Sequence, residues 1–390
     1  MKIYFDENMP FAREFFNELG GEQHQLVPFK GRELSADDLV DADVLLVRSI
    51  TKVNEALLCK AQQLTFVGTA TIGVDHIDQT YLAKRGITFS SAPGCNAISV
   101  AEFVISSLVI LAERYQLPLL DKTVGIVGAG NTGSRLSEKL IALGIRYKLC
   151  DPILAAAGDS RDFVTLEEAL ACDVVSLHVP LTRDGQYPTY HLLNSTRLSA
   201  LSEQQILINA CRGEVIDNQA LLALKQQGHG VTLVMDVWED EPDVLTDLIP
   251  YADLATAHIA GYSLEGKARG TEILYQALCQ QMGLGDNKQL SDFLPAPTVA
   301  CVQVNGVKAE QGISKNQKVD EILLNQLVKM VYDVRRDDGI FRQQLSRFGF
   351  DHIRKNYPVR REFSSLSVSG ESSSLNTLVQ LGFNGTKSKA

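Results

Sequence analysis

Residues 123–133, TVGIVGAGNTG, decide the fold of this chain. The apolar run TVGIV leads into Gly128, Gly130 and Gly133, and a helix-forming stretch follows from Ser134. The spacing GxGxxG between a strand and a helix is typical of the turn at which an open parallel sheet binds a dinucleotide. The first glycine permits a tight turn, the second lets a pyrophosphate approach the backbone, and the third lets the helix pack closely on the strand.

The next predicted strand, at residues 147–152, strengthens this interpretation. It ends in Asp151, 18 residues after Gly133. A carboxylate there can accept hydrogen bonds from both ribose hydroxyls, and its charge repels a 2′-phosphate. Asn131 and Thr132 lie at the helix N-terminus, where N–H groups favour a bound phosphate. The sequence therefore predicts a Rossmann domain that binds NAD in preference to NADP.

Short apolar runs alternate with amphipathic segments on both sides of this stretch, which predicts an α/β protein with parallel sheets. Expected strands lie at 1–5, 44–49, 64–70, 87–90, 172–180, 205–213, 232–238 and 253–261. Long helices are expected at 96–115 and 261–282. Beyond residue 285 the pattern changes to strand, helix, strand and helix, which indicates a small separate α/β domain.

Composition narrows the class of protein. The 390 residues are 45% hydrophobic and 22% charged, as in a soluble globular enzyme of two or three domains. A formal net charge of −10 argues against a general nucleic-acid binder. No apolar run reaches the ~20 residues that span a bilayer. The seven cysteines are scattered and never spaced as CxxC, so we expect a reducing, cytoplasmic location and no metal site.

Four polar side chains lie at or just beyond the carboxyl ends of predicted strands, where open α/β sheets place ligands: Arg212, Asp236, Glu241 and His258. Each alone has an ordinary structural explanation, as a surface arginine, a helix cap, part of an acidic run and a core histidine. Together they fit hydride transfer from a hydroxyl-bearing carbon. A histidine can take the hydroxyl proton, a carboxylate can fix its tautomer, and a guanidinium can hold a substrate carboxylate. His178 is the main rival base, but it lies within an apolar strand.

These motifs, in this order, resemble the D-isomer-specific 2-hydroxyacid dehydrogenase family. The resemblance rests on GIVGAGNTG, LHVPLT, INACRGEVID, MDVWEDEP and TAHIAGYS, between residues 123 and 263. It implies a Rossmann NAD-binding domain, a flavodoxin-like substrate domain, and a catalytic triad of Arg212, Glu241 and His258. The HVP of the second motif, where HTP is common, is a mild departure.

The resemblance assigns further positions. It implies NAD contacts at Asp236, Gly261 and the backbone of Val179, and substrate contacts at Ser49, Thr71 and Tyr262. It also implies a substrate-binding domain of residues 1–117 and 260–284 and an NAD-binding domain of residues 118–259. The two domains would close on the substrate through hinges near 117–122 and 260–263.

The remaining residues, 285–390, resemble the extra C-terminal domain of one branch of the family. The segments LPAP, VYDVRRDD and RKNYPVRREFSSL carry this likeness, and FDENMP, VRSITKVNE and FVGTATIGVDH extend it to the N-terminal half. The branch uses the extra domain for homodimerisation and oxidises a small phosphorylated hydroxyacid in vitamin B6 synthesis. Two alternatives stay open: another family member such as a 3-phosphoglycerate dehydrogenase, and a non-catalytic NAD-sensing protein.

A phosphorylated substrate needs cationic donors. Arg48, beside Ser49 at a predicted strand end, is the first candidate because its planar fork matches phosphate geometry. Residues 341–390 hold eight Lys and Arg against three Asp and Glu and could add another donor. Arg335 and Arg336, just before them, could instead pair with nearby aspartates on a solvated helix end.

Overall fold

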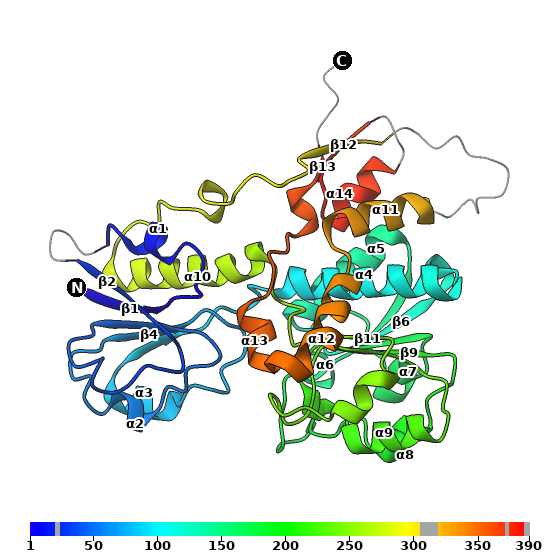
Figure 1. Cartoon of the computed structure of the whole chain (residues 1–390), viewed down its shortest axis with the longest axis horizontal. Coiled ribbons are helices and arrows are strands. Elements are labelled where there is room, and N and C mark those ends of the chain that lie inside the picture. The colour runs from blue at the N-terminus through cyan, green and yellow to red at the C-terminus, as the bar shows by residue number, and fades with distance from the viewer. Residues whose placement is uncertain (20–23, 305–318, 371–373, 386–390) are drawn as a thin grey trace. The chain divides into compact units, whose positions relative to one another are not determined.

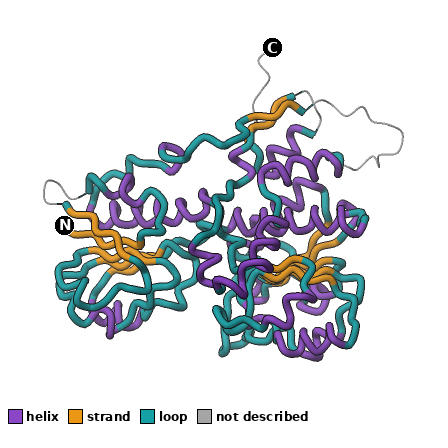
Figure 2. The backbone as a smooth tube through the Cα atoms, viewed as in Figure 1, coloured by secondary structure: helices purple, strands orange, loops and turns teal. Residues whose placement is uncertain are grey.

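A computed structural model describes residues 1–19, 24–304, 319–370 and 374–385 of the chain. The backbone forms two compact units, Met1–Asn96 with Ser263–Pro295, and Ala97–Tyr262 with Ala296–Ala390 (Figures 1 and 2). These bounds differ from the predicted domains, because residues 97–117 and the C-terminal region group with the nucleotide-binding fold. The division into three functional domains stays a prediction.

The first unit contains a five-stranded parallel sheet in the order β2-β1-β3-β4-β5, which is the flavodoxin-like order. Its strands are β1 (Lys2–Asp6), β2 (Gln25–Phe29), β3 (Val44–Val47), β4 (Phe66–Thr69) and β5 (Thr88–Ser90). Its helices are α1 (Ala12–Phe16), α2 (Glu55–Leu58), α3 (Gln79–Arg85) and α10 (Leu264–Met282). The edge strand β2 was not predicted, because Pro28 interrupts a short, partly exposed run.

Both faces of this sheet are covered, so β3 and β4 are buried throughout. On one face Phe15 of α1 packs against Tyr275 of α10, with ring centroids 5.3 Å apart. The opposite face holds a separate apolar cluster that includes Leu39 and Leu58. Burial on both faces explains why these strands read as continuous apolar runs.

The second unit contains a six-stranded parallel sheet in the order β11-β10-β9-β8-β6-β7. A bridge between Leu149 and Phe163 extends the β7 edge, where the third strand of a Rossmann sheet would lie. The strands are β6 (Thr123–Val127), β7 (Arg146–Cys150), β8 (Val174–Leu177), β9 (Ile206–Asn209), β10 (Thr232–Met235) and β11 (Leu254–Ala255). The order reverses between β6 and β8, which is where open sheets bind dinucleotides.

Helices α4 (Ala97–Tyr115) and α5 (Asn131–Leu143) pack together within this unit. The fold is completed by α6 (Pro152–Ala156), α7 (Leu166–Leu170), α8 (Ser195–Ser199) and α9 (Asn218–Gln226). Although α4 is buried along most of its length, none of the helices in the described residues is long and apolar enough to cross a membrane.

The C-terminal region adds a three-stranded parallel sheet and four helices to the second unit. These are β12 (Cys301–Gln303), β13 (Ser367–Ser369), β14 (Asn384–Gly385), α11 (Glu321–Val331), α12 (Arg335–Phe348), α13 (Phe350–Lys355) and α14 (Leu375–Leu381). Helices α12 and α13 were not predicted. Gly339 and a dense run of charges obscure the spacing of Phe341, Leu345 and Phe348, which lie on one helical face.

A buried ionic network joins this region to α4 and α5. The Nζ atom of Lys139 lies 3.1 Å from Oε1 of Glu102 and donates to the carbonyl of Leu381 at 2.6 Å. Oε2 of Glu102 accepts the N–H of Phe363 at 3.0 Å. Buried charges of this kind are stable only when paired and hydrogen bonded. The C-terminal region from Ala296 onward therefore groups with the nucleotide-binding unit in the two-unit division.

Candidate functional site

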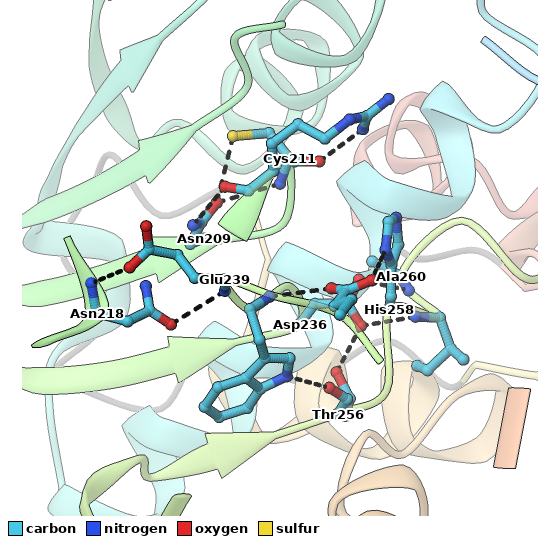
Figure 3. Close-up of polar contacts among 12 residues, drawn as sticks. Asn209, Cys211, Asn218, Asp236, Glu239, Thr256, His258 and Ala260 are labelled. Atoms are coloured by element: carbon cyan, nitrogen blue, oxygen red, sulfur yellow. Dashed lines mark hydrogen bonds and ion pairs between the residues drawn. The ribbon is translucent and has the colours of Figure 1, made fainter. Parts of the chain in front are cut away.

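The candidate site lies at the carboxyl ends of the second unit's strands. Gly128 follows β6, Arg212 follows β9, and Asp236 follows β10. His258 comes three residues after the end of β11. Because the sheet is parallel, these positions meet at one edge, as the sequence predicted. Asp236 and His258 are among the residues that Figure 3 labels at this edge.

Glu241 and His258 form a hydrogen-bonded pair. The Nδ1 atom of His258 lies 2.7 Å from Oε2 of Glu241, and Oε1 of Glu241 accepts the backbone N–H of Trp238 at 3.0 Å (Figure 3). An ionised carboxylate only accepts, so Nδ1 carries the proton and Nε2 is left to act as a base. The histidine thus has the tautomer that proton abstraction requires.

Asp236 holds the segment that carries this histidine. Its carboxylate is fully buried and accepts hydrogen bonds from the Thr256 hydroxyl at 2.6 Å and from the N–H groups of Ile259 at 2.8 Å and Ala260 at 3.0 Å. His258 has a φ of 55°, an uncommon value for a residue with a side chain. The bonds to Asp236 stabilise that turn, so the carboxylate positions the base; direct NAD contact stays a prediction for this residue.

Arg212 begins a tight turn that packs against the Trp238 turn. Its carbonyl accepts from Nδ2 of Asn209 at 2.9 Å, and its Nη1 donates to the carbonyl of Cys211 at 2.7 Å. A Cβ on the next residue, Gly213, would lie 1.9 Å from the carbonyl carbon of Trp238. Only glycine allows this approach, which fixes the arginine turn against the segment that carries Glu241.

The glycine turn has the geometry of a dinucleotide site. Gly128 has a φ of 95°, and a Cβ there would lie 2.5 Å from the carbonyl oxygen of His178. Gly130 caps α5 and faces open space, since a Cβ would meet nothing within 4 Å. Oδ2 of Asp151 accepts the N–H of Ala129 at 3.0 Å, which places its carboxylate beside the turn. These residues fit a bound dinucleotide.

The remaining predicted NAD positions flank the same edge. Asn131, Thr132 and Gly133 form the first turn of α5. Val179 is half-buried just beyond β8, and Gly261 is buried after the base. Their contacts with NAD stay predictions.

The predicted substrate residues divide between the two units. Arg48 and Ser49 follow β3, and Thr71 follows the neighbouring strand β4. Arg48 donates to the carbonyl of Asn8 at 2.8 Å, and the Thr71 hydroxyl donates to the carbonyl of Gly73 at 2.9 Å. Tyr262 belongs to the second unit. The roles of all four in substrate binding stay predictions.

Two other histidines of this unit, His178 and His191, have surroundings that differ from those of His258. Burial lowers the pKa of His178 to about 4, and its Nε2 lies 2.8 Å from the Ser176 hydroxyl, so it remains neutral and packed. The Nε2 atom of His191 lies 2.6 Å from Oε1 of Glu239. One ligand atom from each of His191, Asp217 and Glu239 lies within 4.8 Å of the other two, which is close enough to hold a metal ion. Glu239 is already engaged, since its Oε2 accepts the N–H of Asn218 at 2.7 Å. This cluster braces the turn before Glu241.

The chain matches two family descriptions. Residues 111–260 match the NAD binding domain of the D-isomer specific 2-hydroxyacid dehydrogenases, which confirms the predicted Rossmann fold and NAD as cofactor. Residues 294–382 match a domain of unknown function, DUF3410.

Solved structures support the same fold. The D-lactate dehydrogenase of Aquifex aeolicus, in complex with NAD and lactic acid, is 26% identical with a TM-score of 0.58, over 74% of this chain and 98% of that one. The NAD⁺-bound 3-phosphoglycerate dehydrogenase of Entamoeba histolytica is 25% identical with a TM-score of 0.61, over 75% of this chain and 99% of that one.

Curated relatives match along nearly the whole chain. The erythronate-4-phosphate dehydrogenase of Colwellia psychrerythraea is 61% identical over 98% of this chain and 100% of its own length. The erythronate-4-phosphate dehydrogenase of Tolumonas auensis is 52% identical over 98% of this chain and 99% of its own length. Such identity, extending through the C-terminal region, confirms the predicted branch: the chain belongs to the erythronate-4-phosphate dehydrogenases of the D-isomer specific 2-hydroxyacid dehydrogenase family.

Proposed function

We propose that this protein oxidises the C2 hydroxyl of 4-phospho-D-erythronate to give 2-oxo-3-hydroxy-4-phosphobutanoate, with NAD as the oxidant. The observation that carries the proposal is the Glu241–His258 pair at the edge of an NAD-binding sheet. The relatives' name supplies the substrate, and the reaction would serve the synthesis of pyridoxal 5′-phosphate.

The side chains divide the work of this reaction. Nε2 of His258 takes the proton of the C2 hydroxyl as the C–H bond breaks. Glu241 holds the imidazole in one tautomer and stabilises the imidazolium that forms. Arg212 binds the substrate carboxylate and the developing carbonyl oxygen through paired N–H donors. NAD, when bound, accepts the hydride.

The substrate contacts proposed for Ser49, Thr71, Tyr262 and Arg48 rest on the family resemblance and on chemistry. The hydroxyls of Ser49 and Thr71 can bond a polyhydroxy acid, and Arg48 can bind its phosphate. Ser49 is exposed after β3, which supports this role.

A steady-state assay tests the proposal. Purified protein should reduce NAD with 4-phosphoerythronate and show a far lower kcat/KM with 3-phosphoglycerate or D-lactate. A preference for 3-phosphoglycerate would instead identify another dehydrogenase of the family. Binding of NADH without turnover of any of the three would support an NAD-sensing protein and overturn the enzymatic proposal.

We further propose that residues 285–390 mediate homodimerisation and that the protein works in the cytoplasm without nucleic acid or membrane partners. Exposed apolar side chains at Ile322 and Met330 of α11 support an interface on this region. Light scattering should give twice the chain mass of 42.8 kDa. A monomer at micromolar concentration would contradict the dimer.

A further inference from the structure

The C-terminal region brings a cation to the catalytic pair. Arg354 lies on α13, within the residues that match the domain of unknown function. Its guanidinium hydrogen bonds to Tyr262, with Cζ 5.6 Å from the Tyr262 ring centroid and 5.9 Å from that of Phe350. Its Nε atom is buried and has no hydrogen-bond partner among the described residues. A buried guanidinium is costly unless nearby negative charge compensates it.

Two carboxylates, Glu241 and Asp351, supply negative charge that acts on Arg354. Burial alone would raise the pKa of the Glu241 carboxyl, but the charge and hydrogen bond of His258 and the charge of Arg354 bring its pKa below the ordinary value. Two other ionisable groups face Arg354, namely Tyr262 and Asp351. Asp236 also faces His258, and burial raises the pKa of this aspartate while the charge of His258 opposes the rise. Arg354 is therefore the arginine whose charge acts on the Glu241 side of the pair.

The surrounding packing keeps Arg354 in place. The Phe341 ring of α12 stacks on Trp238 with centroids 5.6 Å apart, and Oδ1 of Asp338 accepts the N–H of Ala255 at 2.8 Å. Arg360 donates to the carbonyl of Ala260 at 3.0 Å. These contacts attach the C-terminal region to both segments that carry the pair, and Phe350 of α13 packs on Phe341 with ring centroids 6.1 Å apart.

We propose that Arg354 is a positioning residue of the active site, whose positive charge acts on the Glu241 carboxylate and whose side chain holds the Tyr262 ring. The same positive charge opposes protonation of the Glu241–His258 pair, so it keeps His258 free to accept a proton at lower pH. The role rests on the proposed oxidation, and it gives residues 294–382 a part in catalysis.

The experiment compares Arg354→Met and Arg354→Lys in the full-length protein. Met keeps an apolar side chain against Tyr262 and Phe350 but removes the positive charge, whereas Lys retains the positive charge. Removing a positive charge lets the Glu241–His258 pair bind its proton more tightly, so the acid limb of the kcat/KM profile should move up by about one pH unit in the Met variant. The Lys variant should keep the original limb. Arg347→Met is the matched control, because Arg347 is exposed and lies over Phe348 in the same region.

A second measurement does not require turnover. The ¹⁵N shifts of the His258 imidazole, assigned with His258→Ala, should titrate at a higher pH in Arg354→Met. This result separates the two proposals, since inactivity of the unmodified enzyme would sink the oxidation while leaving the titration shift intact. If Arg354→Met unfolds at a clearly lower temperature than the unmodified protein, Arg354→Gln provides the neutral side chain instead.

Three results would overturn the role of Arg354. The first is an unchanged titration in a folded neutral variant. The second is an equal shift in the Met and Lys variants, which would assign the effect to shape. The third is a rise in KM confined to phosphorylated substrates with the acid limb unmoved, which would make Arg354 a phosphate ligand.

Discussion

The ring of Trp238 stacks on that of Phe341 at 5.6 Å, and the indole N–H donates to the carbonyl of Thr256 at 2.9 Å. One side chain thus connects the segment that leads to Glu241, the segment that leads to His258 and a helix from the C-terminal region. The active-site geometry depends on packing as well as on the catalytic groups themselves.

Replacing Phe341 by Ala should weaken this connection. The ring is fully buried between Trp238 and Phe350, so its loss should destabilise the fold by about 3–5 kcal/mol. Thermal unfolding measures the effect. Phe348→Ala is the control, since that ring is 44% exposed and should cost little. Equal losses from both variants would show that the Trp238 contact is unimportant.

His258→Ala should lower kcat by ~10²–10⁴-fold, because no other group described at this strand edge has its tautomer fixed for proton abstraction. NADH binding, followed by fluorescence, should stay nearly unchanged since the glycine turn is untouched. Near-normal turnover by this variant would remove His258 from the mechanism.

Glu241→Gln should move the acid limb of the pH–rate profile to lower pH. The neutral amide no longer stabilises a protonated imidazole, so the base loses its proton more easily. This shift of the acid limb is opposite in direction to the shift expected for Arg354→Met, so each variant serves as a control for the other. A limb that stays in place would show that Glu241 and His258 are not coupled in solution.

Asp151→Ala should narrow the preference for NAD over NADP. Each carboxylate oxygen accepts one backbone N–H, from Ala129 and from Leu154, and keeps acceptor capacity for the ribose hydroxyls. Its charge repels a 2′-phosphate, so loss of the carboxylate should reduce kcat/KM mainly with NAD. Both cofactors should be compared in the same assay. Equal use of NAD and NADP by the unmodified enzyme would contradict this assignment.

Arg48→Ala should raise the KM for the phosphorylated substrate by ~10-fold or more and leave activity on an unphosphorylated 2-hydroxyacid nearly unchanged. A proportionate loss of activity on both substrates would exclude phosphate recognition by Arg48.

The same unit holds a second cation close to Arg48. Burial and the charge of Arg48 lower the pKa of Lys267 to about 8, so Lys267 is charged below that pH and neutral above it. If Lys267 helps to bind the phosphate, the KM should rise above pH 8, and Lys267→Met should abolish that rise.

The sequence was sufficient for the nucleotide-binding fold because each signal there is local. Gly128 needs its left-handed φ, Asp151 ends a strand, and the runs around Leu207 and Val234 are apolar because helices cover both faces of the sheet. The pairing of Glu241 with His258 could be proposed because both follow neighbouring strands.

Arg354 could not be found in that way. Its partner Tyr262 lies far from it along the chain, and the helix that carries it follows a run dense in charges. Only the three-dimensional packing places this arginine over the ring of Tyr262. Arg336 and Arg335 instead pair with Asp337 at 2.8 Å and with Asp333 at 2.9 Å, which is the alternative that the sequence left open.

The bond from Lys139 to the carbonyl of Leu381 has a consequence for local unfolding. Leu381 is the last residue of α14, so this helix supplies one of the two acceptors of a buried ammonium, and Glu102 supplies the other. Opening of α14 would leave Lys139 with an unsatisfied donor in the core, which is costly. We therefore expect the amide protons of α14 to exchange with solvent together with those of α5, and not ahead of them.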